Sequence, residues 1–251
     1  MSGAQCCENP PTLNSASGNG KVEEFGGLSS YIYGPSNSNL AVILVSDVYG
    51  YEAPNLRKLA DKVGAAGFWA VVPDLVFHRD PTVPDPNTFT EWLKTHGPDQ
   101  GFEDAKPVIE ALKSKGITKI GAAGFCWGAK VVVELSKHPY IQAAVLIHPS
   151  LVSVEDIQGV KVPLSILGAE IDRVSPPEVV KQFEAALNAK PEVDSFVKIF
   201  AGCSHGWSVR YKDEDEGAVK RAEEAHKDML DCLLSISTEF GLQFCCFCLC
   251  C

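Results

Sequence analysis

The chain has 251 residues, 45% of them hydrophobic, which is enough apolar material for the core of one globular domain. Its formal charge of −10 argues against nucleic acid or an anionic membrane surface as the main partner, because both are bound through basic patches. No apolar stretch approaches the roughly 20 residues that span a bilayer, and no secretion signal is visible at the start. We therefore expect a cytoplasmic protein, monomeric or homodimeric, that acts on a small molecule.

The ten cysteines are too unevenly placed for a disulfide framework. Cys6 and Cys7 lie near the start, five lie between Cys245 and Cys251, and the body of the chain has only three: Cys126, Cys203 and Cys232. A reducing compartment is the simpler inference, and there Cys126 stays a thiol.

The first half of the chain predicts short strands and one amphipathic helix. Residues 1–20 are rich in Pro, Ser, Asn and Gly and predict an irregular lead-in. Runs over 22–25 and 28–33, separated by Gly26-Gly27, predict a hairpin. The apolar run 40–45 predicts a central strand, and a helix follows it with one apolar face formed by Leu56, Leu59, Ala60 and Val63.

Strands and helices then alternate along the chain. Further strands are expected over 68–73, 119–124, 143–147, 162–168 and 195–200, and helices over 102–115, after Cys126, 177–189 and 217–234. Pro107 fits the first turn of its helix or kinks it. The proline-rich stretch 77–101 predicts a long loop with a turn or two of helix around 89–93.

This alternation is typical of an α/β fold with a mostly parallel central sheet and helices on both faces. We expect that domain over 21–237, followed by a mobile Cys-rich tail over 238–251. The tail could also be S-acylated or, with enough well-placed ligands, bind zinc.

The stretch that organises the chain is Gly124-Phe125-Cys126-Trp127-Gly128, between a predicted strand and a predicted helix. A nucleophile on such a turn sits in strained backbone, and the flanking glycines let strand and helix approach closely. A helix N-terminus also favours a thiolate over a thiol. Taken alone, a cysteine is more often a small buried hydrophobe, so the interpretation depends on its partners.

Asp172 and His205 are those candidate partners. Like Cys126, each follows a predicted strand, and ligands of open α/β sheets bind beyond the carboxyl ends of the strands. The order nucleophile, acid, base is that of the α/β-hydrolases. His205 would take the thiol proton, and Asp172 would orient the imidazole. Glu170 is a competing acid, less favoured because Asp172 lies deeper in the loop.

The chain resembles the dienelactone hydrolase family, the carboxymethylenebutenolidase group of the α/β-hydrolases, and plant members most of all. The resemblance covers about 22–234 and rests on five motifs: Gly124–Gly128, Asp47–Gly50, Val72–Leu75, Asp172 and His205-Gly206. It implies that an ester or lactone of a small molecule is hydrolysed through a thioester acyl-enzyme, with no cofactor and no metal.

The resemblance also implies roles for neighbouring residues. Backbone N–H groups of Val48 and Trp127 would hold the oxyanion. Asp47 occupies the position of a glutamate that pairs with the resting thiol in bacterial members, although its side chain is one methylene shorter.

The sequence suggests candidates for substrate binding but does not decide among them. Arg79 and Arg210 are candidates for a substrate carboxylate, although an exposed arginine is as plausible for each. Tyr49 and Trp207 are candidates for the pocket wall, and for Trp207 core packing is equally plausible.

Two other functions stay open. One is a β-glucan glycosidase, as some plant relatives are named, although no pair of carboxylates in the sequence signals that chemistry. The other is a binder or redox sensor without catalysis, in which Cys126 is merely oxidisable.

Overall fold

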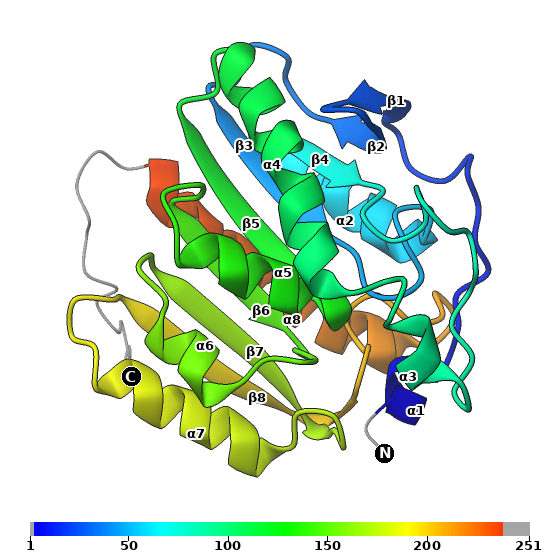
Figure 1. Cartoon of the computed structure of the whole chain (residues 1–251), viewed down its shortest axis with the longest axis vertical. Helices are drawn as coiled ribbons and strands as arrows, with labels where there is room; N and C mark the ends of the chain where they lie inside the picture. The colour runs from blue at the N-terminus through cyan, green and yellow to red at the C-terminus, as the bar shows by residue number, and fades with distance from the viewer. Residues whose placement is uncertain (1–2, 238–251) are drawn as a thin grey trace.

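The computed structural model describes residues 3–237 and has one eight-stranded sheet (Figure 1). The strands are β1 (Lys21–Phe25), β2 (Leu28–Tyr33), β3 (Leu40–Val45), β4 (Trp69–Pro73), β5 (Lys119–Phe125), β6 (Ala143–Ile147), β7 (Leu164–Ile171) and β8 (Ser195–Ser204). The α-helices are α1 (Gly3–Cys6), α2 (Pro54–Ala65), α3 (Phe89–Trp92), α4 (Pro98–Ser114), α5 (Trp127–Ser136), α6 (Val154–Gln158), α7 (Pro177–Asn188) and α8 (Glu216–Leu234), and a 3₁₀ turn follows at Ser235–Ser237.

The sheet is mostly parallel, as predicted. Its order is β1-β2-β4-β3-β5-β6-β7-β8, and every pair from β4 to β8 is parallel. The predicted hairpin is confirmed: β1 pairs antiparallel with β2, which joins the edge of the sheet against β4. Parallel strands share one carboxyl-end edge, so the loops after β3, β5, β6, β7 and β8 come together there.

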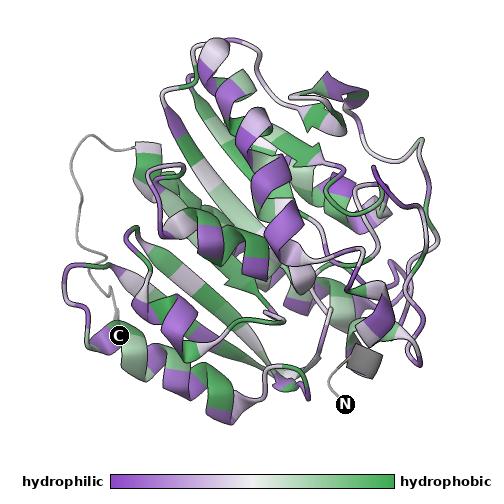
Figure 2. Cartoon of the chain, in the orientation of Figure 1, coloured by the Kyte–Doolittle hydropathy of each residue, from purple (hydrophilic) through white to green (hydrophobic). Residues whose placement is uncertain are grey.

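Helices cover both faces of the sheet. Apolar side chains of α4, α5, α6 and α7 pack in one core cluster, and those of α2 and α8 pack in a second cluster on the opposite face. Figure 2 shows the central strands as the most hydrophobic part of the chain and the outer helix faces as polar. Burial on both faces explains why β3, β4 and β6 are continuous apolar runs rather than alternating ones.

Several boundaries differ from the prediction. α4 begins at Pro98, not at residue 102, because a proline fits the first helical turn, so Pro107 lies inside the helix and not in its first turn. β7 and β8 extend to Ile171 and Ser204, past their apolar runs, because they continue to pair with each other across a bulge. The capped helix α6 was not predicted.

The N-terminal lead-in departs most from expectation. It forms one helical turn, α1, near α3 (Figure 1), and the side chains of Cys6 and Cys7 are buried with 1% and 6% exposure. We refer to residues 5–12 as the N-terminal strap. The expected Cys-rich tail lies outside the described residues. Within residues 3–237, no helix is long and apolar enough to cross a membrane.

Candidate active site

Cys126 sits on a sharp turn between β5 and α5, as its sequence motif predicts. Its backbone has φ 52° and ψ −110°, a left-handed conformation that L-residues rarely adopt. A Cβ on Gly124 would lie 2.3 Å from the Gly128 carbonyl oxygen, and one on Gly128 would lie 2.3 Å from that of Val45. Both glycines are therefore required by close backbone approach, and together they hold the strained turn.

Asp172 and His205 form the predicted hydrogen-bonded pair. They directly follow β7 and β8, and Nδ1 of His205 lies 2.8 Å from Oδ2 of Asp172. The other carboxylate oxygen accepts hydrogen bonds from the backbone N–H groups of Val174 and Ser175. Glu170 instead accepts from the N–H of Gly202 and is exposed. The geometry thus selects Asp172 over Glu170 as the partner of His205.

The pair is electrostatically adapted to a charged imidazole. Burial is the largest influence and opposes a charge on either group, but the favourable contacts together outweigh it. The pKa of Asp172 is lowered by His205 and by two backbone N–H groups, and that of His205 is raised by Asp172 and by Cys6. An ionised Asp172 fixes the Nδ1–H tautomer, which leaves Nε2 of His205 directed away from the carboxylate. That nitrogen is buried and has no hydrogen-bond partner.

Cys6 of the N-terminal strap lies close to the imidazole of His205. The sulfurs of Cys6 and Cys126 and a ring nitrogen of His205 all lie within 4.8 Å of one another, and all three residues are buried. Within residues 3–237 this is the one group of His, Cys, Asp and Glu with such spacing. Zinc takes Cys and His ligands, but a closed zinc site needs a fourth, and the group offers three.

The pKa values of the two thiols are shifted in opposite directions. The pKa of Cys6 is lowered to about 5, chiefly because Cys126 donates a hydrogen bond to its sulfur and also because His205 lies beside it. Burial raises the pKa of Cys126 well above its usual value. The pair as a whole therefore carries one thiolate near neutral pH.

Asp47 makes no hydrogen bond to the Cys126 thiol among the described residues, and the resting-thiol role that the family resemblance implies stays a prediction. Its Oδ2 lies 3.0 Å from Nε of Arg210 in a buried ion pair, although the angle is not that of a hydrogen bond. Its Oδ1 accepts the N–H of Tyr49. In this structure the neighbour of the Cys126 sulfur is Cys6.

Arg210 and Tyr49, both predicted to bind substrate, hold the N-terminal strap in place. Nη1 of Arg210 donates to the carbonyl oxygens of Cys6 and Glu8, each at 2.8 Å. The Tyr49 hydroxyl donates to the carbonyl of Cys7 at 2.6 Å. The side chains of Tyr49 and Arg210 are both buried, so two buried groups of the hydrolase domain hold the strap in place.

Further contacts fasten the strap beside Asp172. The side chain of Gln5 donates to the carbonyl of Ile171 and accepts the N–H of Arg173. Cys6 itself lies 3.4 Å from the hydroxyl of Ser150. The strap thus closes the carboxyl-end edge of the sheet over Cys126, whose exposed fraction is 0%.

The two backbone donors expected from the family resemblance, Val48 and Trp127, follow β3 and Cys126. Trp127 is the first residue of α5, so its N–H is one of the helix's unpaired donors. Val48 lies fully buried after β3. No hydrogen bond from either N–H to another backbone or side-chain group is found among the described residues.

The other two candidates for substrate binding, Arg79 and Trp207, do not contact the strap in the same way as Arg210 and Tyr49. Arg79 is 54% exposed and pairs with Asp104 of α4. Trp207 packs its ring against Phe200 and His148. Trp207 therefore has the aromatic packing that the sequence left open, and it also lines the neighbouring cavity.

His148 is a site residue that the sequence analysis missed. It follows β6, is fully buried with φ 38°, and its ring lies 5.0 Å from that of His205. Burial lowers its pKa well below the usual value, so the imidazole is neutral, and its ring packs edge-on against that of His205. Its position after a strand, in His148-Pro149-Ser150, was the signal that could have identified it.

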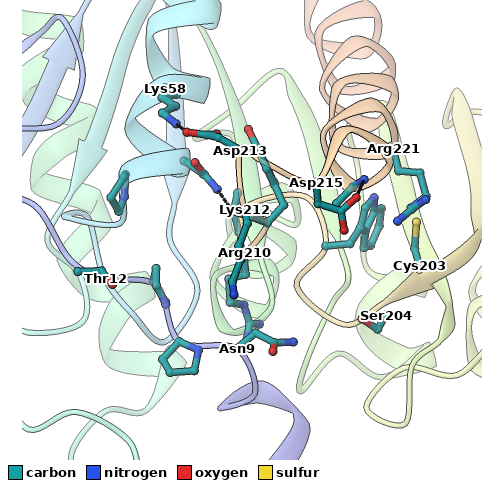
Figure 3. Close-up of a pocket in the computed structure, with 18 of the residues that line it drawn as sticks. Asn9, Thr12, Lys58, Cys203, Ser204, Arg210, Lys212, Asp213, Asp215 and Arg221 are labelled. Atoms are coloured by element: carbon teal, nitrogen blue, oxygen red, sulfur yellow. Dashed lines mark hydrogen bonds and ion pairs between the residues drawn. The ribbon is translucent and has the colours of Figure 1, made fainter.

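A cavity of about 690 Å³ is lined by Ser204 and Trp207, which lie on either side of His205 in the sequence (Figure 3). Its wall includes Asn9 and Thr12 of the strap, Lys58, Arg210 and Arg221, and neither Cys126 nor His205 lines it. Because the cluster of Cys6, Cys126 and His205 lies outside its wall, we regard this cavity as a neighbour of the candidate site and not as the site itself.

Comparison with known proteins agrees with the fold. A Klebsiella pneumoniae protein whose structure carries a dienelactone hydrolase name superposes with a TM-score of 0.71 over 88% of this chain and 97% of its own, at 20% identity. This level of identity supports the fold alone.

Sequence relatives are more similar. A maize protein named endo-1,3;1,4-beta-D-glucanase is 41% identical over 76% of this chain, and the match spans 64% of the maize protein's length. A carboxymethylenebutenolidase homolog of Xenopus tropicalis is 36% identical over 82% of this chain and 86% of its own. Residues 28–237 match the sequence model of the dienelactone hydrolase family. These findings confirm the resemblance first suggested by the Gly-Phe-Cys-Trp-Gly motif, and with it the expectation of a hydrolase: the chain belongs to the dienelactone hydrolase family.

Proposed function

We propose that this protein hydrolyses an ester or lactone of a small molecule through Cys126, His205 and Asp172. The observation that carries the proposal is the strained Cys126 turn within 4.8 Å of a His205 nitrogen that Asp172 holds in one tautomer. The names of the carboxymethylenebutenolidase relatives support the substrate class.

In the proposed reaction, His205 takes the proton of Cys126 as the sulfur attacks the carbonyl carbon. The N–H groups of Val48 and Trp127 stabilise the oxyanion, where one lost donor typically costs about 100-fold or more in rate. His205 then protonates the leaving alkoxide, and water attacks the thioester with His205 as base. The acid product and the free thiol result.

Substrate entry requires a movement of the strap. The side chains of Cys126 and His205 have no exposed surface, because Cys6 and its neighbours cover them. An ester carbonyl that reaches the sulfur must therefore take the place of Cys6. The adjoining cavity, whose wall the strap shares, is the natural space for the rest of the substrate.

The test is a panel of aryl esters and lactones with wild type and Cys126→Ala. We expect hydrolysis to fall by at least about 1,000-fold in the variant, with an unchanged circular dichroism spectrum. Cys232→Ala is the matched control, since Cys232 is also a buried free thiol but lies on α8. Ester hydrolysis that survives Cys126→Ala would refute the proposal.

A β-glucan glycosidase remains the second candidate because of the maize relative's name. That chemistry needs one carboxylic acid with a raised pKa beside a second carboxylate. Near Cys126, however, Asp172 has a lowered pKa and Asp47 is paired with Arg210. Release of reducing sugar from mixed-linkage glucan by Cys126→Ala would favour this candidate over ester hydrolysis.

A further inference from the structure

Two thiols 120 positions apart in sequence meet at the centre of the candidate site. Cys6 and Cys126 are both buried free thiols, and their sulfurs lie within 4.8 Å of each other. The proposed hydrolysis requires only one of them. Cys6 therefore has no assigned task, although the strap contacts hold it in a defined place.

We propose that Cys6 and Cys126 are an oxidative-modification site, at which hydrogen peroxide joins the two sulfurs in a reversible intramolecular disulfide. The disulfide itself is independent of the hydrolase chemistry. Its consequence, storage of the nucleophile in a protected and inactive form, rests on the proposed function.

The chemistry balances with peroxide as the only oxidant. The thiolate of the pair attacks one peroxide oxygen, the O–O bond breaks, and the departing hydroxide takes a proton to become water. The sulfur is now a sulfenic acid, oxidised by two electrons. The second sulfur then attacks it, the S–O bond breaks, and hydroxide leaves with the second thiol's proton as another water. The sum is two thiols and one peroxide giving one disulfide and two waters.

The pair is suited to the first step because it holds a thiolate. Thiolates and not thiols react with peroxide, and the low pKa of Cys6 beside Cys126 and His205 keeps one sulfur of the pair ionised. Peroxide has two heavy atoms, so any path that admits an ester substrate also admits it.

The structure also selects Cys6 over its neighbour Cys7. Burial raises the pKa of Cys7 to about 11, so its thiol is protonated and slow to react. The cluster of sulfurs and His205 includes Cys6 but not Cys7. Cys7 is therefore the matched control: it is adjacent in sequence, buried, and outside the site.

The strap contacts make ring closure efficient. Arg210 binds the carbonyl oxygens on either side of Cys7, and Gln5 and Ser150 fix the other side of Cys6. Cys6 is thus held beside Cys126 before oxidation, and the second step is intramolecular. Once formed, the bond would fasten the strap over the site and exclude substrate.

The first arm of the test maps the disulfide. Full-length wild type, Cys6→Ser and Cys7→Ser are treated with hydrogen peroxide, alkylated without reduction, digested and analysed by mass spectrometry. We expect the Cys6–Cys126 linked peptides in wild type and Cys7→Ser. The same digest of a variant with serine at all five cysteines of 245–251 shows whether the tail is needed. A Cys6–Cys7 bond, a bond to the tail, or no bond as the main product would overturn the proposal.

The second arm measures protection of the nucleophile. Each protein is treated with peroxide until its ester hydrolysis has fallen below about a tenth, and the hydrolysis recovered after dithiothreitol is compared with its own untreated value. We expect wild type and Cys7→Ser to recover at least about half, and Cys6→Ser less than about a tenth, because an unresolved sulfenic acid proceeds to irreversible acids. Equal recovery in Cys6→Ser would refute the resolving role. If no ester is hydrolysed by untreated protein, the proposed function fails, while the mapping still decides the disulfide.

Discussion

The buried Arg210–Asp47 pair yields the sharpest stability prediction, for the variant Arg210→Met. The two side chains are 2% and 3% exposed and their charged atoms are 3.0 Å apart. Methionine keeps much of the side-chain volume but leaves the Asp47 carboxylate buried without its counter-charge. Loss of one partner of a buried pair typically costs about 3–5 kcal/mol.

This cost is large enough to be measured directly. For a chain of this size about 1 kcal/mol moves the melting temperature by roughly 2–4 °C, so we expect a fall of about 6–20 °C. Urea unfolding followed by circular dichroism gives the free energy independently. Arg79→Met is the matched control: that guanidinium is 54% exposed, and exposed pairs contribute about 0–1 kcal/mol.

A double variant tests the cause of the instability. If the unpaired carboxylate is responsible, Asp47→Asn added to Arg210→Met restores part of the lost stability, because the uncompensated charge is removed. The reasoning is refuted if Arg210→Met and Arg79→Met have unfolding free energies within about 1 kcal/mol of each other. In that case Arg210 would be better explained as the substrate-binding group that the sequence suggested.

Three further variants test the site. Gly128→Ala should fail to fold or lose at least several kcal/mol, because its Cβ would meet two backbone oxygens. Gly217→Ala, at an exposed position of α8, should instead gain up to about 1 kcal/mol in urea unfolding. Equal stability of the two would contradict the close approach. Tyr49→Phe should lose about 0.5–1.5 kcal/mol with its one bond to the strap; no loss would mean that the bond is not formed in solution. Asp172→Asn removes the carboxylate charge that helps to raise the pKa of His205, so the acid limb of kcat/KM should move to lower pH, and a shift to higher pH would refute the assignment. The Asp172–His205 pair stabilises the fold fully at pH values above the ordinary Asp pKa of 3.8 and below the ordinary His pKa of 6.5. The difference in unfolding free energy between wild type and Asp172→Asn should therefore be largest in that window.

Local sequence determined the scaffold and the nucleophile's turn. Continuous apolar runs such as 40–45 and 143–147 predict strands buried on both faces, and such strands form a parallel sheet only with helices on each side. The close approach at Gly124 is a contact between adjacent elements, β5 and α5, so that geometry is encoded within five residues. Such features depend on neighbours in the chain, which is why they could be predicted. Gly128, in contrast, approaches the carbonyl oxygens of Val45 and Ser46 at the end of β3, a contact that depends on the packing of α5 against the sheet.

The choice of His205's partner was only partly determined by sequence. Glu170 and Asp172 both follow the same apolar run, and position in the loop favoured Asp172 without excluding Glu170. Regular strand alternation would place Glu170 and Asp172 on the same side, but the register shift between Ala169 and Ile171 interrupts it. Glu170 then bonds the N–H of Gly202, and Asp172 bonds His205.

Only the tertiary structure decided what surrounds the thiol. Nothing in the sequence near Cys6 indicates that it reaches Cys126, because that contact is made by a strap without periodicity that crosses the carboxyl-end edge of the sheet. The pairing of Asp47 with Arg210 likewise joins loops 163 positions apart. Such long-range contacts depend on how complete elements pack against one another, so a local pattern of residues does not predict them.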